Sequence, residues 1–370
     1  MHQVELSYLL SPQRSADALI RNPLMDMLHA VREQGSIAKA SKSLGLSYRN
    51  VWGALKDWEH KLGRALIVWD KGQRAKLTEF GEKLLWAERQ AQARLAPQIE
   101  ALRGDIERAF ASAFDDSGHV LTLYASHDAA LTALREHTSQ SGLHLDIRFM
   151  GSVDAIAALN AGRCTLAGFH TVDQPGRQTI AAKTYRSLLK PGRHKLIGFA
   201  HRTQGLIVAR GNPLRVRALA DLTRADVRYV NRAFGTGTRV LLDQLLAEAG
   251  IAASDIAGYA SQEPSHLAVA QAVASGAADA GLGIETAARG KALGFVPLID
   301  ERYHLVCLKS ELDSPAVQAL RGALQSQPWQ RILSSLPGYS AARAKSGEVL
   351  SLSAVLPWWR YRQWTAGGAG

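Results

Sequence analysis

The residues GSIAKASKSLGLSYRNVW, 35–52, carry the strongest fold signal in the N-terminal part of this chain. It predicts two short helices on either side of a single glycine turn at Gly45, which is the pattern of a helix-turn-helix. Ala40 is small enough for the two helices to cross closely. Leu44 and Leu46 are expected to pack beneath the turn.

The neighbouring residues complete a small helical domain. Pro23 fits the first turn of a helix whose apolar residues between 24 and 31 share one face and which ends at Gly35. Ser47 is predicted to cap a third helix that extends to about Leu62.

A basic hairpin follows the third helix. Residues 65–78 predict two strands around a turn at Lys71 and Gly72, which would form a wing along a phosphate backbone; a solvated charged hairpin is the alternative. The exposed start of the third helix would carry side chains that donate to phosphates and base edges. The candidate DNA-contacting residues are Ser36, Lys39, Ser47, Tyr48, Arg49, Asn50, Lys56, Lys71, Arg74 and Lys76.

The net charge favours a polyanionic partner. The 370 residues are 46% hydrophobic and 21% charged, which is typical of a globular chain of two or three domains and excludes disordered and fibrous proteins. The chain carries a net charge of +11, and residues 36–76 hold nine Lys and Arg against three Asp and Glu. More than half of the surplus therefore lies in the predicted helix-turn-helix and wing.

No segment predicts export or a membrane span. No run approaches the roughly 18 apolar residues that a span needs, and the N-terminus lacks the features of a signal peptide, so we expect a cytoplasmic protein. Residues 4–10, VELSYLL, predict a short strand instead. Cys164 and Cys307 lie in apolar runs and are expected to be buried, with neither a disulfide framework nor a zinc site.

From Thr78 the pattern predicts a long amphipathic helix. Its apolar residues between Phe80 and Ile106 are spaced by three, four or seven. Pro97 is expected to kink or break it. The apolar stripe would pair with the same stripe of a second chain or fold back onto its own domain.

After a linker at residues 115–118, strand and helix signals alternate in the βα rhythm of a parallel sheet. Two such lobes, joined by the β-prone residues 195–208, would place a cleft at the carboxyl ends of the strands. Aromatic and arginine side chains at residues 358–364 would stack on a base or pack on the second lobe. The predicted strands are 120–125, 145–150, 164–169, 227–231, 256–260 and 280–284, and the helices are 129–136, 153–160, 238–249 and 266–275.

Small hydroxyl residues follow the strands that would open onto the cleft. Free amides and a hydroxyl at a helix start favour an anion, although Ser and Thr are also ordinary N-caps. The loop GTGTR at residues 235–239 goes beyond capping, because its two glycines let the backbone approach a ligand closely. The hydroxyl residues are Ser126, Ser152, Thr236, Thr238 and Ser265.

The sequence does not predict an enzyme. It contains no phosphate-binding GxxxxGK[ST], no HExxH and no GxSxG, and no catalytic residue or metal ligand is nominated. The histidines His127, His170, His201 and His266 are scattered, and the carboxylates of Asp128 and Glu263 near strand ends are expected by chance.

The motifs GSIAKA (35–40), LSYRNVW (46–52) and LTEFG (77–81) together resemble the winged helix-turn-helix of ModE-type molybdate-responsive regulators, and are also similar to that of LysR-type regulators. The resemblance spans residues 4–91. Beyond it the chain departs from ModE-type proteins, whose helix-turn-helix precedes small molybdate-binding barrels.

The segments QGLIVARGNP (204–213), VNR (230–232), GTGTR (235–239) and ADAGLGI (278–284) resemble the periplasmic-binding-protein-like domain fused to such regulators and to molybdopterin-biosynthesis proteins. This resemblance covers residues 120–312 and implies a type II two-lobed α/β fold. It implies molybdate, tungstate or a molybdenum-cofactor species as the effector, with no other cofactor.

We therefore expect an α/β plus α protein: a winged helix-turn-helix at residues 1–80, a dimerisation helix at 81–116, a two-lobed sensor at 117–345 and a tail at 346–370. It would bind an operator as a homodimer or homotetramer. An organic carboxylate effector, or a molybdenum-handling protein without DNA binding, are the alternatives. The candidate ligand residues are Ser126, His127, Ser152, Arg202, Thr236, Gly237, Thr238, Arg239, Ser265 and His266, with Arg232 in the same motifs; ion pairs between the lobes are the alternative role of the arginines.

Overall fold

The computed structural model describes residues 22–68, 74–114, 119–173, 176–177 and 179–359. The chain forms two compact units, residues 1–92 and 93–370, which are described separately. The strand predicted at residues 4–10, the wing turn at Lys71 and Gly72, and the tail beyond residue 359 lie outside the described residues.

The first unit is the predicted three-helix domain with a hairpin. Buried apolar side chains from all three helices, among them Leu28, Ala40 and Val51, form its core with the first strand of the hairpin. The elements are α1 (Pro23–Gln34), α2 (Ile37–Ser43), α3 (Tyr48–Leu62), β1 (Ile67–Val68), β2 (Lys76–Leu77) and the beginning of α4 (Glu79–Phe114).

Local capping explains where these helices begin and end. Gly35 ends α1 with a φ of 61°, a conformation that favours glycine. The hydroxyls of Ser36 and Ser47 accept from backbone N–H groups three residues on, and so cap α2 and α3 as predicted for Ser47. One expectation is wrong: Leu46 is 41% exposed, and of the two leucines only Leu44 packs partly against the core. The left-handed turn at Gly45, with a φ of 67°, separates the two.

The second unit is built on one mixed sheet. Its described strands run in the order β4-β3-β5-β10-β6-β9-β7-β8, and β11 pairs with β6 outside this row. They are β3 (His119–Ala125), β4 (Leu143–Phe149), β5 (Leu166–Val172), β6 (His194–Val208), β7 (Tyr229–Arg232), β8 (Gln262–Glu263), β9 (Ala280–Ile284), β10 (Gly294–Leu308) and β11 (Val349–Leu350).

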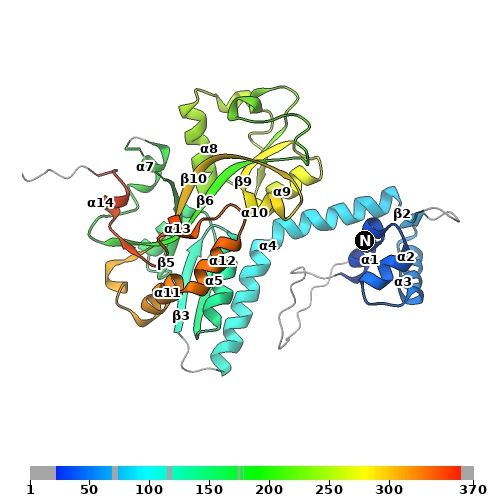
Figure 1. Cartoon of the computed structure of the whole chain (residues 1–370), viewed down its shortest axis with the longest axis horizontal. Coiled ribbons are helices and arrows are strands. Elements are labelled where there is room, and N and C mark those ends of the chain that lie inside the picture. The colour runs from blue at the N-terminus through cyan, green and yellow to red at the C-terminus, as the bar shows by residue number, and fades with distance from the viewer. Residues whose placement is uncertain (1–21, 69–73, 115–118, 174–175, 178, 360–370) are drawn as a thin grey trace, which may run out of the picture. The chain divides into compact units, whose positions relative to one another are not determined.

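Two long antiparallel strands, β6 and β10, divide this sheet into lobes (Figure 1). Parallel pairs β3/β4 and β3/β5 make the first lobe, and β7/β8 and β7/β9 make the second. Each lobe has buried apolar clusters on both faces of its strands, so each is a three-layer structure. The helices are α5 (Ala129–Ser139), α6 (Ser152–Asn160), α7 (Ile180–Tyr185), α8 (Gly237–Glu248), α9 (His266–Ala274), α10 (Glu285–Arg289), α11 (Pro315–Gln325), α12 (Gln327–Ser335), α13 (Ala341–Ala344) and α14 (Leu352–Val355), with 3-10 turns at Leu219–Thr223, Ala253–Asp255 and Lys309–Glu311.

This architecture confirms the predicted fold class, and three details differ from the predictions. The strand predicted at 256–260 is wrong, since Gly258 with a φ of 88° turns the chain there against the backbone of Tyr229. Pro97 does not break α4, which continues through it as one helix, and the alternative of a kink at Pro97 stays a prediction. Trp358 packs in the first lobe against Tyr185, not on the second lobe, because β11 returns the chain to β6.

Both cysteines are free and buried, as predicted. In the part of the chain that the structure covers, no helix is both long and apolar enough to span a bilayer.

Candidate functional site

Helix α3 presents the polar face that the sequence predicts for DNA. Val51 and Leu55 are buried, whereas Tyr48, Arg49 and Asn50 are exposed at the N-terminal end of the helix. Such a face supplies donors to phosphates and base edges. The other described candidates are also surface residues: Lys39, Ser47, Lys56, Arg74 and Lys76 are exposed, and Ser36 is half-buried as a helix cap.

The second candidate site lies where the lobes meet at β6 and β10. At its centre the buried Arg202 donates through Nε to Oε1 of Glu301 at 2.6 Å and through Nη1 to Asp128. The hydroxyl of Tyr339 donates to the same Asp128 carboxylate at 2.8 Å. Although burial opposes it, the two carboxylates hold the pKa of Arg202 above its ordinary value. Arg202 is thus a fully paired cation that joins both long strands to the start of α5.

Arg232 on β7 is also a buried cation but, in contrast to Arg202, it has no carboxylate partner among the described residues. It is 2% exposed, and its Nη1 donates only to the backbone carbonyl of Glu263 at 3.1 Å. Within the described residues its Nε has no partner and no carboxylate pairs with it. Burial and the nearby Arg202 lower the pKa of Arg232 to about 9. A guanidinium in this position favours an anion.

Two buried imidazoles accompany Arg232. His170 comes from β5 in the first lobe and His266 from the start of α9 in the second. Burial and the positive charge of Arg202 and Arg232 lower the pKa of both, so both are neutral. Neither ring nitrogen of His170, nor Nδ1 of His266, finds a hydrogen-bond partner in the described part of the chain.

Two hydroxyls of the first lobe complete this group. The Ser152 hydroxyl at the start of α6 is buried and, as far as the structure describes the chain, makes no hydrogen bond of normal geometry. The Tyr185 hydroxyl lies near enough for Ser152 to oppose the increase that burial causes in the pKa of Tyr185. We call Ser152, His170, Tyr185, Arg232 and His266 the inter-lobe cluster.

The glycine loop of the second lobe reaches this cluster. A Cβ on Gly237 would lie 2.9 Å from Nδ1 of His170 and 3.3 Å from Oγ of Ser152. A Cβ on Gly151 would lie 2.7 Å from the carbonyl oxygen of Gly235. Gly237 therefore lets the backbone of the second lobe approach polar side chains of the first, and Gly151 lets the backbones of the two lobes approach each other.

The remaining hydroxyl candidates are engaged within the protein. Thr236 and Ser265 cap α8 and α9, accepting from backbone N–H groups at 3.3 and 3.1 Å. Thr238 accepts from Nε2 of Gln204 at 3.1 Å, and Ser126 donates to the carbonyl of Met150 at 3.3 Å. Ser152 is therefore the candidate whose hydroxyl the fold leaves open to a ligand.

The remaining charged candidates lie at the edge of the cluster. Arg239 pairs with Asp243 at 3.1 Å and stacks on Tyr259, with 4.2 Å from its guanidinium carbon to the ring centre. His127 lies 3.7 Å from a carboxylate oxygen of Glu100 on α4. Arg202 thus forms ion pairs, the alternative role of the arginines, whereas the pair of Arg239 lies within α8 and does not join the lobes.

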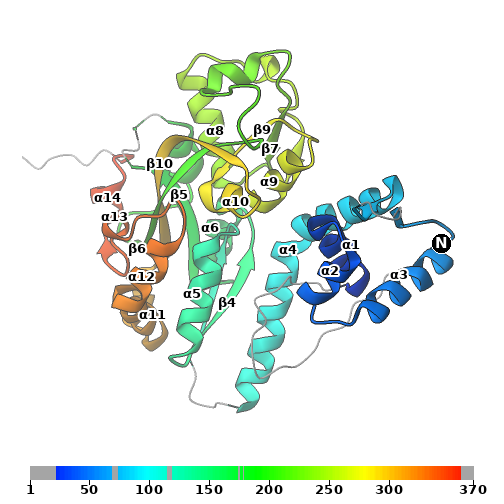
Figure 2. The same cartoon turned by 45° about the vertical axis from the view of Figure 1, so that its right-hand side comes forward.

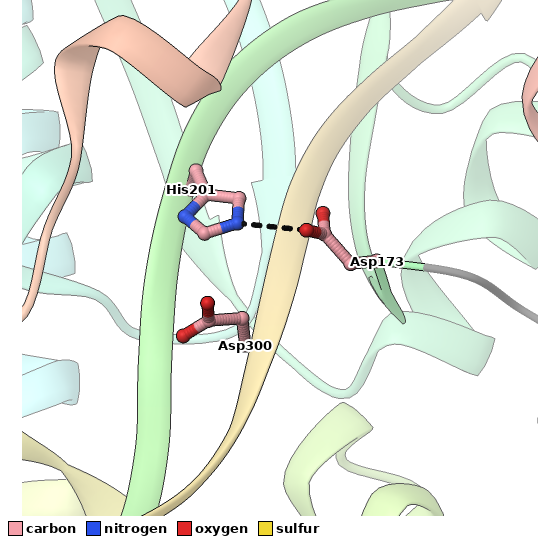
Figure 3. Close-up of side chains that lie close together, drawn as sticks. All are labelled: Asp173, His201 and Asp300. Carbon is pink, nitrogen blue, oxygen red and sulfur yellow. Dashed lines mark ion pairs between the residues drawn. The ribbon is translucent and has the colours of Figure 1, made fainter.

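A second charged group lies on the paired long strands β6 and β10 and at the end of β5 (Figure 3). Asp173, His201 and Asp300 are the described residues whose ligand atoms, all within 4.8 Å, could surround a metal ion. Both carboxylates are already satisfied, since Arg302 donates to Asp173 at 2.6 Å and Arg343 donates to Asp173 and Asp300 at 2.7 and 2.6 Å. Burial opposes it, but the bond from Arg302 keeps the pKa of Asp173 below its ordinary value. We interpret the group as an ion-pair network.

Two members of the inter-lobe cluster were absent from the candidates drawn from the sequence. His170 stands inside a buried strand, LAGFHTV, where a polar residue in an otherwise apolar run was the available signal. Tyr185 ends the short helix α7, and nothing in its local sequence marks it.

Comparison with known proteins assigns both units. A model of the PBP superfamily domain matches residues 134–325, more than half of the chain, and one of bacterial regulatory helix-turn-helix proteins of the lysR family matches residues 24–82. The chain belongs to the PBP superfamily and, with its helix-turn-helix, is a ligand-responsive, DNA-binding transcriptional regulator of the LysR type.

Two curated relatives carry no assigned function. The uncharacterized protein YvgK of Bacillus subtilis is 33% identical over 226 residues, covering 61% of this chain and 72% of YvgK. An uncharacterized protein in the ferredoxin 2Fe-2S gene 5' region of Clostridium pasteurianum is 34% identical over 113 residues, 30% of this chain and 98% of that protein.

Solved structures of LysR-type regulators are more distant. Full-length CbnR complexed with its target DNA is 17% identical with a TM-score of 0.39, covering 81% of this chain and 98% of CbnR. Full-length LysG from Corynebacterium glutamicum with bound effector Arg is 21% identical with a TM-score of 0.37, covering 82% and 96%. The assignment of the family rests on the two model matches.

Proposed function

We propose that this regulator senses a tetrahedral oxyanion, molybdate or tungstate, at the inter-lobe cluster and controls molybdenum-related genes. The observation that carries the proposal is the buried Arg232, a cation with no carboxylate partner among the described residues. An anion there would relieve the cost of burying an unpaired charge.

The neighbouring polar atoms support a ligand bound by both lobes. Ser152 and His170 from the first lobe, and Arg232 and His266 from the second, have polar atoms that the described part of the protein does not satisfy. A ligand that accepts from both lobes would stabilise their closed arrangement. The choice of molybdate or tungstate is supported by the resemblance of both halves of the chain to proteins of molybdenum biology. A molybdenum-cofactor species and an organic carboxylate are the competing effectors.

A thermal-shift series tests the ligand. At a ligand concentration 100 times Kd, binding adds about 2.7 kcal/mol, and each kcal/mol raises the midpoint of a domain this size by about 2–4 °C. We expect molybdate and tungstate, but not sulfate, to produce such a shift. Ser152→Ala should reduce the shift without unfolding the protein, since that hydroxyl makes no hydrogen bond of normal geometry with the described residues. Ser139→Ala, on the exposed end of α5, should leave the shift unchanged. A shift with carboxylates alone would replace the oxyanion by an organic effector.

The exposed face of α3 supports operator binding by a dimer or tetramer, with recognition helices entering major grooves about 34–36 Å apart. On α4, Leu95 and Leu102 are seven residues apart and exposed, so they offer an apolar stripe to a second copy. Band-shift assays with Arg49→Ala and Asn50→Ala test this half. If the wild-type protein shifts no DNA and both variants keep all other function intact, a molybdenum-handling protein without DNA binding would be favoured.

A further inference from the structure

The part of α4 that belongs to the second unit contacts both lobes. It runs beside α5, as Figures 1 and 2 show. We call residues 93–100 the linker segment. Its Arg94 holds the second lobe, donating through Nε and Nη2 to the two carboxylate oxygens of Glu263 at 3.0 and 2.7 Å. Glu263 is 6% exposed, so this pair neutralises a buried carboxylate.

A proline in α4 leaves a backbone carbonyl free to make a second contact with this lobe. In an α-helix each N–H donates to the carbonyl four residues earlier, and Pro97 has no N–H. The carbonyl of Ala93 therefore lacks its partner within the helix. The hydroxyl of Ser265 donates to that carbonyl at 3.2 Å. Pro97 thus leaves the Ala93 carbonyl of α4 available as an acceptor, and the Ser265 hydroxyl of the second lobe is the donor.

The other end of the linker segment holds the first lobe. The Glu100 carboxylate accepts from the Thr132 hydroxyl at 2.9 Å and lies 3.7 Å from Nε2 of His127. Nη1 of Arg135 donates to the Glu100 carbonyl at 3.0 Å. Burial opposes it, but His127 and Thr132 keep the pKa of Glu100 below its ordinary value, so the group is charged at neutral pH.

These contacts fall on the loops that border the inter-lobe cluster. Glu263 is the residue whose carbonyl accepts from Arg232, and Ser265 directly precedes His266. His127 contributes to the positive charge that lowers the pKa of His266 after burial and the larger effects of Arg232 and Arg202. One helical segment of eight residues, about 12 Å long, therefore links both sides of the cluster.

We propose that the linker segment is a latch that binds both lobes only in their closed arrangement, so that its docking and anion binding stabilise each other. The inference rests on the proposed function, because the latch would be the means by which anion binding at the inter-lobe cluster affects α4. The sign follows from the contacts: without Arg94, the buried Glu263 carboxylate would lose its ion pair, which would destabilise the strand whose Glu263 carbonyl accepts from Arg232. By linkage, an anion that strengthens lobe closure strengthens latch docking by the same factor.

Hydrogen exchange of the full-length protein, with and without molybdate, tests the latch. We expect molybdate to slow exchange of the amides at residues 93–100. Arg94→Ala should speed exchange in this segment and also at residues 127–132 on the other lobe, and should raise the Kd for molybdate roughly 5-fold. This is the low end of ordinary coupling between sites, since Arg94 is 58% exposed. Arg94→Lys should show a smaller effect. Gln98→Ala, on the exposed side of the same turn, should show none.

The outcomes separate the latch from the proposed function. If molybdate raises the melting midpoint but Arg94→Ala leaves both the Kd and the exchange at 127–132 unchanged, the latch is wrong and the sensor stands. If no oxyanion binds the wild-type protein, the proposed effector is wrong, and the ligand-free exchange of Arg94→Ala decides the latch alone. Faster exchange confined to residues 93–96 in that variant would also overturn it, because the segment would then be bound to one lobe.

Discussion

Replacing Arg232 by methionine should stabilise the unliganded protein and abolish its response to the anion. The side chain is buried, carries a charge that no described carboxylate neutralises, and lies near a second cation, Arg202. Methionine removes the charge while retaining an unbranched apolar chain that can fill much of the same space. A residue that costs stability in the free protein but is needed for the ligand is what a sensor site requires.

The pKa gives the size of the effect. Burial and Arg202 lower the pKa of Arg232 from its ordinary value to about 9. At about 1.4 kcal/mol per pKa unit, keeping the guanidinium charged costs the folded state roughly 5 kcal/mol. The variant also loses the hydrogen bond to the Glu263 carbonyl, which costs about 1–3 kcal/mol and offsets part of the stabilisation. The net gain of roughly 2–4 kcal/mol should raise the melting midpoint of the unliganded protein by at least ~4 °C.

The lowered pKa of Arg232 also determines how the difference in stability between Arg232→Met and wild type depends on pH. Because the folded-state pKa of this base is lowered, its cost is fully present below pH 9 and declines as the pH rises through about 9. The difference in midpoint between Arg232→Met and wild type should therefore be constant at neutral pH and shrink above pH 9.

Differential scanning calorimetry without ligand and then with molybdate measures both predicted effects, the higher midpoint of the unliganded variant and the loss of its response to the anion. Arg228→Met is the matched control, because this arginine directly precedes β7 but is exposed and paired with Asp279 at 2.9 Å. The control should keep the ligand response and change the midpoint little. A lower midpoint for unliganded Arg232→Met, or an undiminished shift with molybdate, would show that the buried charge of Arg232 neither destabilises the free protein nor binds the anion.

Three further predictions concern other parts of the chain. Asp128→Asn removes one of the two carboxylates that hold Arg202 and should lower the free energy of unfolding in urea by about 3–5 kcal/mol; a loss below 1 kcal/mol would show that Glu301 suffices. Arg49→Ala should weaken binding to all DNA sequences alike and reduce the slope of log K against log salt by about one, measured by fluorescence anisotropy; loss confined to one operator would indicate a base contact. Pro97→Ala restores a helical hydrogen bond that competes with Ser265, so the melting midpoint should rise while amides near Ser265 exchange faster; slower exchange there would contradict this.

The helix-turn-helix could be predicted from the sequence because its signals are local. Gly35, Gly45 and Ser47 act on backbone within a few residues, and the structure places each cap where the pattern predicts it. The same holds for most strands and helices of the lobes. The strand predicted at 256–260 failed because its apolar pattern could not reveal that Gly258 packs directly on Tyr229, some thirty residues earlier.

The candidate ligand site was harder to predict because its chemistry depends on distant contacts. Local sequence marks Thr236 and Ser265 equally as caps and as anion donors, and only the fold shows that their oxygens are engaged. Conversely, Arg202 and Arg232 are both arginines on strands, yet one meets two carboxylates and the other meets none that the structure describes. Which arginine remains available to a ligand is decided by strand pairing across about a hundred residues.

The register of the two long strands has a consequence for how such regulators diversify. The chain enters the second lobe along β6 and returns along β10, and at the far end Val208 pairs with Gly294. The residues between them are therefore an insert whose two ends are already adjacent. An exchange of this insert with that of a related chain would bring a new Arg232, His266 and glycine loop while Ser152, His170 and the DNA-binding unit stay the same. In the proposed sensor, such an exchange would change the effector specificity within one gene, without a new operator.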